Sequence, residues 1–299
     1  MIPAGPHGGD GARLARSLGL LAEEVLDLSA SLNPVAPDPA AAIAAHLGAV
    51  GRYPDAEAAT AALAAAMGVA AGNLLLTNGG AEAIALVAGE LGPGWVDEPD
   101  FSLYRRHLVG LDPDGPRWRS NPHNPSGRLA PPSEAADVWD EAFWPLATGT
   151  WTRGDHTAGR VVLGSLTKLL ACPGLRIGYV LGGADLIGRL AARQPRWAVN
   201  GLACEALPDL LAPVDLATWA KEVARLRAGL IDVLTDHGFA PEDTDANWVL
   251  VRAPELRARL ASRGVLVRDC ASFGLPGTAR IAVPSERNLQ RLEAALCPD

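Results

Sequence analysis

Cysteine is scarce in this sequence and follows no recognisable pattern. The 299 residues include four cysteines, Cys172, Cys204, Cys270 and Cys297, and no two of them form a C-x-x-C pair. Such wide spacing is typical neither of a zinc site nor of a small disulfide-bonded scaffold. We therefore expect no bound metal, and reduced thiols as in a cytoplasmic protein.

Excess positive charge and long apolar runs are lacking too. The net charge is −8 and the isoelectric point is near 5.3, and no basic stripe is present that could neutralise the phosphates of a nucleic acid. No apolar run approaches the length that spans a bilayer, and residues 1–11 contain no apolar segment preceded by basic residues. We expect no nucleic-acid partner, no membrane span and no signal peptide.

Short apolar runs alternate with alanine-rich segments of helical pattern along most of the chain. The run at residues 74–77 leads through Asn78, Gly79 and Gly80 into a helix candidate at 81–91. Strand, glycine turn and helix form the opening unit of an α/β domain. The last third alternates strands with helices in an α+β pattern. We expect an extended N-terminal arm at 1–35, a large domain at 36–205 and a small domain at 206–299.

Two polar loops are candidate binding segments. Asn-Gly-Gly-Ala-Glu at 78–82 stands where a strand passes into a helix, so its backbone N–H groups can face an anion. Asn-Pro-His-Asn-Pro-Ser-Gly at 121–127 is a loop stiffened by two prolines. Taken singly, the first is more typical of a glycine turn that merely joins two elements, and the second is as typical of a surface turn as of a binding loop.

Two ionisable side chains are candidates for catalysis. Asp140 ends an apolar run, at the carboxyl edge of a sheet where open α/β folds bind ligands, although a lone aspartate there is also typical of a helix cap. Lys168 follows another apolar run and is surrounded by leucines, where desolvation would lower its pKa and make it nucleophilic rather than a solvated surface lysine. Ser165 and Arg176 are positioned in the sequence to bind a phosphate beside it.

Together these clusters resemble the fold type I pyridoxal-phosphate enzymes of the class I/II aminotransferase family. The shared order is a phosphate loop, a stacking aromatic residue, Asn-Pro-x-Gly, an aspartate, and Ser-x-x-Lys with an arginine eight residues later. The resemblance extends from about His7 to Val283, nearly the whole chain. It implies an α/β fold with a mostly parallel central sheet, helices on both faces and a smaller C-terminal α+β domain.

The resemblance also implies a role for each matching residue. Lys168 would carry pyridoxal 5'-phosphate as a Schiff base, and Asp140 would pair with the protonated ring nitrogen, which keeps the ring an effective electron sink. Phe101 would stack on the ring and Asn124 would bind its phenolic oxygen. The cofactor phosphate would be held by Gly80, Ala81, Ser165 and Arg176. Tyr53 would reach the phosphate of a neighbouring subunit, which implies a homodimer with a shared active site.

Within the family, the chain resembles the branch that holds histidinol-phosphate aminotransferase and the threonine-phosphate decarboxylase of cobalamin biosynthesis. An N-terminal His-Gly-Gly-Asp at 7–10, the segment 28–34 that contains Asn33, and Phe143 where most aminotransferases have tyrosine favour the decarboxylase. Arg280 would bind the substrate carboxylate, and Arg268, expected on a neighbouring strand of the small domain, would complete the substrate site with His7 and Asn33. The expected reaction is decarboxylation of L-threonine O-3-phosphate to aminopropanol phosphate; histidinol-phosphate-type transamination is the alternative.

One departure from the family pattern affects this expectation. Only about 16 residues separate Tyr104 from Asn121, where the family has room for a further strand–helix–strand stretch, and the segment from Gly127 to Asp140 is short as well. A trimmed strand or helix could narrow the site. It could also indicate a degenerate protein that binds the cofactor without turnover. A regulatory cofactor-binding protein is a further alternative, which is disfavoured because regulators of this fold carry a separate DNA-binding domain and this sequence starts directly in the enzyme-like arm. A cofactor-free interaction protein is another, which the joint presence of Lys168, Asp140 and Arg176 disfavours.

Overall fold

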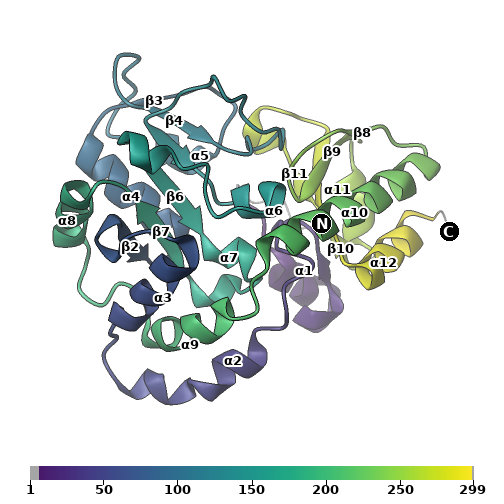
Figure 1. Ribbon diagram of the computed structural model, residues 1–299. Coiled ribbons are helices and arrows are strands. Elements are labelled where there is room, and N and C mark those ends of the chain that lie inside the picture. The colour runs from purple at the N-terminus through teal and green to yellow at the C-terminus, as the bar shows by residue number, and fades with distance from the viewer. Residues whose placement is uncertain (1–6, 298–299) are drawn as a thin grey trace.

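A mixed sheet organises the larger part of the molecule, as the computed structural model of residues 7–297 shows (Figure 1). Within these residues the sheet has six strands in the order β2-β7-β6-β5-β4-β3. Strands β3 to β6 are parallel to one another, and β7 runs antiparallel to both of its neighbours. The strands are β2 (Leu74–Thr77), β3 (Trp95–Val96), β4 (Arg117–Ser120), β5 (Val138–Asp140), β6 (Val161–Ser165) and β7 (Gly178–Leu181).

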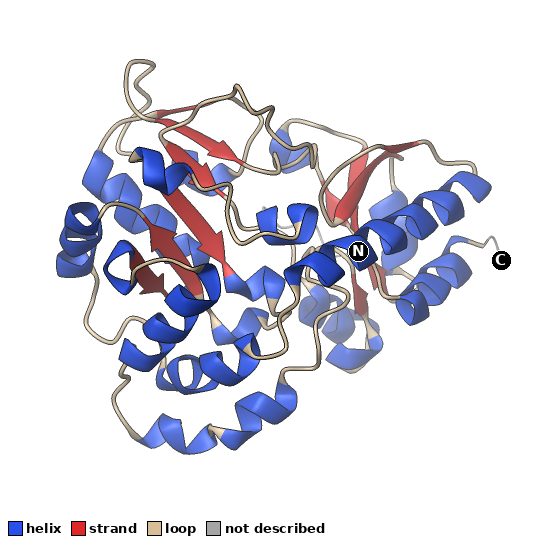
Figure 2. Ribbon diagram, viewed as in Figure 1, coloured by secondary structure: helices blue, strands red, loops and turns tan. Residues whose placement is uncertain are grey.

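Helices cover both faces of this sheet because its strands alternate their apolar side chains (Figure 2). Trp118 and Val138 face one core, with α4 (Gly79–Leu91), α5 (Ser102–His107) and α8 (Ala184–Arg193). Trp139 and Val162 face the opposite core. The helices of that second side are α2 (Ala40–Ala45), α3 (Glu57–Met67), α7 (Leu166–Leu169) and α9 (Gly201–Leu211). The predicted α/β class with a mostly parallel sheet is confirmed.

The C-terminal part forms a second, antiparallel layer, in the strand order β11-β12-β9-β8. Its strands are β8 (Pro241–Glu242), β9 (Trp248–Arg252), β11 (Arg268–Asp269) and β12 (Thr278–Ala282). Its helices are α10 (Leu216–Asp236), α11 (Leu256–Ala261) and α12 (Glu286–Leu296), and the short α6 (Trp144–Thr148) packs against α10. Residues 265–269 form two separate strands, because β10 (Val265–Leu266) pairs with another segment than β11 does.

That other segment belongs to the N-terminal arm, which is not extended as predicted. Residues Gly11–Leu18 form helix α1, and β1 (Leu26–Asp27) runs parallel to β10. Leu14 and Ala15 bury one side of α1 against Ala261 and Leu266 of the small domain. The glycines at 8, 9 and 11 suggest an irregular segment, but tertiary packing on this apolar side stabilises the helix. Residues 11–28 of the arm therefore pack with the small domain.

The two cores meet along α10. Leu216, Trp219 and Val223 at its start belong to the core of the large sheet, whereas Leu226 and Leu230 further along belong to the core of the small domain. The predicted boundary at 205/206 falls inside α9, and α9 packs wholly on the large domain. We therefore propose a boundary at residues 212–215, between α9 and α10. In the described chain, no helix is both long and apolar enough to cross a membrane.

The shortened segments change how the sheet is connected. After α5 the chain makes only an isolated bridge, between Gly94 and Leu111, before it enters β4. The parallel strands β4 and β5 are then joined by residues 121–137 without a helix. Such crossovers usually contain a helix that covers the sheet. In this protein the loop of residues 121–137 takes the place of that helix.

Arginines attach this loop to the sheet. Arg117 of β4 donates to the Ala135 carbonyl at 2.6 Å and to the Glu134 carboxylate at 2.7 Å. Arg119, also of β4, donates to the same carboxylate at 2.9 Å. From the other side, Arg153 donates to the carbonyls of Pro132 and Glu134 and stacks 4.7 Å from the Trp139 ring. Glu134 is thus the anion that neutralises two arginines where a helix is missing.

This arrangement predicts a specific loss of stability in Glu134→Gln. The amide keeps the shape of the side chain but removes the charge between Arg117 and Arg119, at a site where the carboxylate is only 17% exposed. We expect the free energy of unfolding to fall by about 1–2 kcal/mol. Chemical denaturation measures it, with Glu293→Gln on the exposed side of α12 as the matched control. Equal midpoints for the two variants would contradict a stabilising role of Glu134.

Candidate active site

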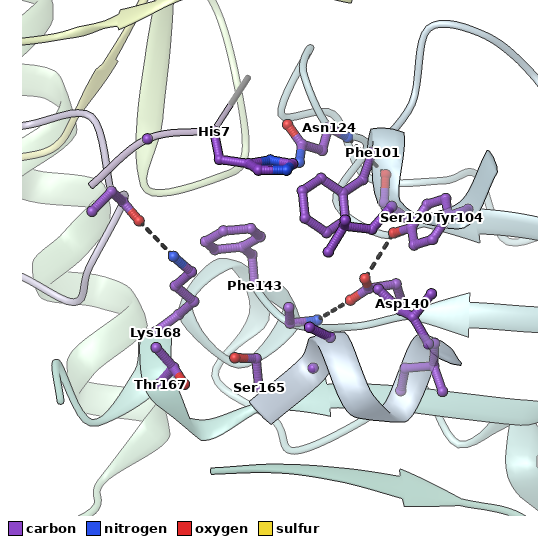
Figure 3. Close-up of a pocket in the computed structure, with 18 of the residues that line it drawn as sticks. His7, Phe101, Tyr104, Ser120, Asn124, Asp140, Phe143, Ser165, Thr167 and Lys168 are labelled. Carbon is purple, nitrogen blue, oxygen red and sulfur yellow. Dashed lines mark hydrogen bonds between the residues drawn. The ribbon is translucent and has the colours of Figure 1, made fainter. Parts of the chain in front are cut away.

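A cavity of about 280 Å³ lies where the carboxyl ends of the parallel strands face the small domain. Its floor holds the last residue of three neighbouring strands, Ser120 of β4, Asp140 of β5 and Ser165 of β6. Ser120 and Asp140 are direct partners in the strand register. Parallel strands end at the same edge of a sheet, so this row follows from the topology. Figure 3 shows these side chains around the cavity.

One end of the cavity is built to receive an anion. Helix α4 begins at Gly79, and its first residues, Gly80 and Ala81, line the cavity together with Ser165 and Arg176. Gly79 has φ +76°, and a Cβ there would lie 2.5 Å from Nη2 of Arg176. Only glycine therefore lets the guanidinium approach the helix N-terminus, where backbone N–H groups and the helix dipole favour negative charge.

Lys168 points into the cavity from α7. Its Nζ donates to the Ala30 carbonyl of the N-terminal segment at 2.9 Å (Figure 3). Burial, followed by the nearby Arg280 and Arg176, lowers the pKa of this lysine to about 8. A large fraction of the amine is therefore neutral, and nucleophilic, near pH 8.

Asp140 is held in a fixed orientation on the floor. One carboxylate oxygen accepts from the Tyr104 hydroxyl at 2.7 Å and the other from the Ala142 backbone N–H at 3.0 Å (Figure 3). Burial raises the pKa of Asp140 to about 6. A desolvated carboxylate of this kind is stabilised by a cationic partner. The carboxylate can therefore pair with a protonated ring nitrogen.

Two arginines enter from the small domain. Arg268 of β11 and Arg280 of β12 are direct partners in the antiparallel register, as predicted for neighbouring strands. Arg280 is buried, and its Nη1 donates to Asn124 Oδ1 at 2.6 Å. Arg268 donates to Ser272 Oγ at 2.9 Å and lies 5.3 Å from the Phe273 ring. Two adjacent guanidinium groups favour a ligand with two anionic groups.

Aromatic side chains form the remaining walls. Phe101 and Phe143 line the cavity, and Phe143 contacts Trp248 edge to face at 4.7 Å. His7 lies 5.9 Å from Phe101, and burial together with Arg268 and Arg106 lowers its pKa. A flat ring can stack between such apolar faces.

Two predicted residues do not line this cavity. Asn33 is buried beneath α7, where its side chain donates to the Leu169 carbonyl and its backbone N–H donates to the Lys168 carbonyl. In this position it supports the lysine rather than facing a ligand. Tyr53 is 78% exposed and stacks on Trp197 at 4.4 Å, outside the cavity. The other predicted site residues all line the cavity.

Tyr104, Ser120 and the Ala30 carbonyl line or support the site but were not predicted from the sequence. Tyr104 falls three residues after Phe101, so one turn of helix brings it beside the same site, a spacing that could have indicated it. Ser120 directly precedes the Asn-Pro motif, but β4 has no clear alternation of apolar residues and was not predicted. The role of Ala30 depends on its backbone and cannot be detected from its side chain.

The residues present fit the cofactor that the sequence predicted. A phosphate matches the N-terminus of α4 with Arg176, a ring matches the space between Phe101 and Asp140, and a carbonyl carbon matches the amine of Lys168. Nε of Arg280 is buried without a hydrogen-bond partner among residues 7–297, so the site retains a donor for a substrate anion. The donor set therefore suits pyridoxal phosphate with an anionic substrate.

Comparisons with known proteins agree with this geometry. Residues 118–296 match the family model described as aminotransferase class I and II. The chain is 31% identical to threonine-phosphate decarboxylase of Salmonella typhimurium, with 97% of this chain and 95% of the relative aligned. It is 30% identical to histidinol-phosphate aminotransferase 1 of Thiobacillus denitrificans, over 91% and 84%. The first alignment spans 353 positions, so the relative has internal residues that this 299-residue chain lacks.

Solved structures show the same fold. L-threonine-O-3-phosphate decarboxylase from Porphyromonas gingivalis superposes with a TM-score of 0.78 at 24% identity, over 91% of this chain and 98% of the other. Histidinol-phosphate aminotransferase from Sinorhizobium meliloti, solved with pyridoxal-5'-phosphate, gives a TM-score of 0.81 at 19% identity, over 99% and 94%. The chain has the predicted fold type I architecture, and it belongs to the aminotransferase class I and II family.

Proposed function

We propose that this protein is a pyridoxal-phosphate enzyme that decarboxylates L-threonine O-3-phosphate. The observation that carries the proposal is the pairing of Arg268 with Arg280 above Lys168, because this substrate bears both a phosphate and a carboxylate. Phe143 adds support, since it places an apolar ring where a tyrosine hydroxyl would contact the cofactor in most aminotransferases. The similarity to named threonine-phosphate decarboxylases is consistent with it.

Different side chains of the cavity bind the cofactor and the substrate. Lys168 anchors the cofactor, Arg176 with the start of α4 holds its phosphate, and Asp140 keeps its ring nitrogen protonated. Bound pyridoxal phosphate supplies an electron sink for a bond that breaks at the substrate's α-carbon. Arg280 binds the carboxylate and Arg268 binds the substrate phosphate, and charge-assisted bonds to arginine fix both groups in direction as well as in place.

Orientation of the substrate by Arg280 determines which bond breaks. In decarboxylation the bond between the α-carbon and the carboxylate breaks, CO2 leaves, and one proton is added to the α-carbon. Lys168, whose amine is close to its pKa at neutral pH, is the group placed to donate that proton. In transamination of an amino acid the same amine would instead remove the α-proton, and the carboxylate of the amino acid would stay bound to Arg280.

Histidinol-phosphate-type transamination is the second candidate, supported by relatives of that name at similar identity. We also propose that the protein is a homodimer in which Tyr53 reaches the cofactor phosphate of the other subunit. The exposed Tyr53 and Trp197 support this, together with exposed Leu47 and Val50 close to Tyr53 in sequence. The mass measured by light scattering tests the assembly.

The reactivity of Lys168 should show its lowered pKa. We expect cofactor-free protein to bind pyridoxal phosphate covalently at a rate that rises with pH to a midpoint near 8, because only the neutral amine reacts. An unperturbed lysine has its midpoint near 10.4. Stopped-flow absorbance measures the rate, with Nα-acetyl-lysine as the reference.

The sequence provides an internal control for this experiment, because it contains two lysines, Lys168 and the exposed Lys221. Borohydride reduction followed by peptide mass mapping should find the pyridoxyl group on Lys168, and Lys221→Ala should leave the signal unchanged. Label on Lys221, or on neither lysine, would refute the assignment of Lys168.

Product analysis distinguishes the two candidate reactions. With L-threonine O-3-phosphate the holoenzyme should release CO2 and aminopropanol phosphate without added 2-oxoglutarate. With histidinol phosphate and 2-oxoglutarate it should form little glutamate. The opposite pattern would establish the aminotransferase. If no product forms from either substrate, the protein binds the cofactor without turnover.

The arginine assignment gives this assay a matched pair of variants. Arg268→Ala should raise the KM for L-threonine O-3-phosphate roughly tenfold or more while the cofactor stays bound, because one charge-assisted bond to the phosphate is lost. Arg252→Ala, an exposed arginine at the end of β9, should leave KM unchanged. Equal KM values for the two variants would remove the support for a phosphorylated substrate.

A further inference from the structure

Asp100 is a buried carboxylate beside the cavity to which the proposed reaction assigns no role. It is 2% exposed and directly precedes Phe101. Its Oδ1 accepts from the Phe101 backbone N–H at 2.7 Å and from Ser120 Oγ at 2.5 Å. Its Oδ2 accepts from the Ser120 backbone N–H at 3.0 Å and lies 3.9 Å from Arg119 Nη1. A carboxylate buried with this many donors is strongly fixed in place.

The hydrogen bonds continue from Ser120 to the substrate arginine. Ser120 Oγ accepts from the Asn124 backbone N–H at 2.8 Å, and Asn124 Oδ1 accepts from Arg280 at 2.6 Å. A carboxylate can only accept, so the Ser120 hydroxyl donates its one proton to Asp100 and accepts from the Asn124 N–H through an oxygen lone pair. The direction of each bond between Asp100 and Arg280 is thereby determined.

We propose that Asp100 is a positioning residue that fixes Phe101 directly, and fixes Asn124 and thus Arg280 through Ser120. One side chain then sets the distance between two sides of the cavity, the aromatic wall and the arginine that we assign to the substrate carboxylate. The connection to a substrate rests on the proposed function. The connection to Phe101 and Arg280 rests on the hydrogen bonds alone.

Two substitutions separate the branches of this network. Asp100→Ala removes the acceptor of both the Phe101 N–H and the Ser120 hydroxyl, because both donate to Oδ1. Ser120→Ala removes only the link to Asn124 and leaves the bond between Asp100 and Phe101. Asp137→Ala is the matched control, because Asp137 accepts from the backbone of Arg117 at the opposite end of β4, away from the cavity.

Crystal structures of the three variants provide the direct test. In Asp100→Ala and Ser120→Ala we expect the bond between Asn124 and Arg280 to be lost, and in Asp100→Ala alone the Phe101 backbone should also move. Asp137→Ala should keep both. A bond between Asn124 and Arg280 that is retained in the first two variants would overturn the proposal, whatever reaction the enzyme catalyses.

The affinities for two ligands, one with and one without a carboxylate, provide a second test. In both site variants we expect the KM for L-threonine O-3-phosphate to rise about tenfold, and the inhibition constant of aminopropanol phosphate, which lacks the carboxylate, to change less than twofold. The double variant should be no worse than the single ones, because both act on the same bonds. An unchanged ratio of the two constants, or additive losses, would overturn the role of Asp100. A wild-type protein that binds neither ligand would instead refute the proposed function, and the crystal structures would still decide on Asp100.

Discussion

The parallel register of β4, β5 and β6 is the constraint on which the site depends. Because these strands end at one edge, Ser120, Asp140 and Ser165 form a single row without any contact between distant loops. The strand–helix turn after β6 then brings Lys168 over that row, and the turn after β2 brings the start of α4 beside it. The chemistry of the cavity is thus arranged by backbone pairing before any ligand contributes.

The row of strand-end residues is kept although the connection between β4 and β5 contains no helix. Arg117, Arg119 and Arg153 hold a loop over the sheet where a crossover helix is usual; the Glu134 carboxylate is the common anion of the first two, and Arg153 donates to the Glu134 carbonyl. Arg119 also lies near Asp100, so one of the arginines that hold this loop contacts the carboxylate that we propose positions Phe101 and Arg280. Loss of the helix therefore need not mean loss of the site, and the predicted site residues of the large domain apart from Tyr53 still converge.

Sequence reasoning succeeded where local chemistry decides the structure, at the glycine turn after β2 and at the lysine between leucines. It also predicted that Arg268 and Arg280 lie on neighbouring strands. It failed where tertiary packing decides. Helix α1 follows several glycines and exists because Leu14 is buried against the small domain. The buried Asn33 and the bonds of Asp100 depend on partners far away in the sequence, which no local pattern reveals.

The central claim is that Lys168 and the row of strand-end residues form one pyridoxal-phosphate site despite the shortened segments. The most direct measurement is a crystal structure of the protein after incubation with pyridoxal phosphate. The account predicts continuous density from Lys168 Nζ into the ring, with the ring nitrogen at Asp140 and the phosphate between Arg176 and the start of α4. A cofactor bound elsewhere, or a cavity that stays without cofactor density, would contradict it.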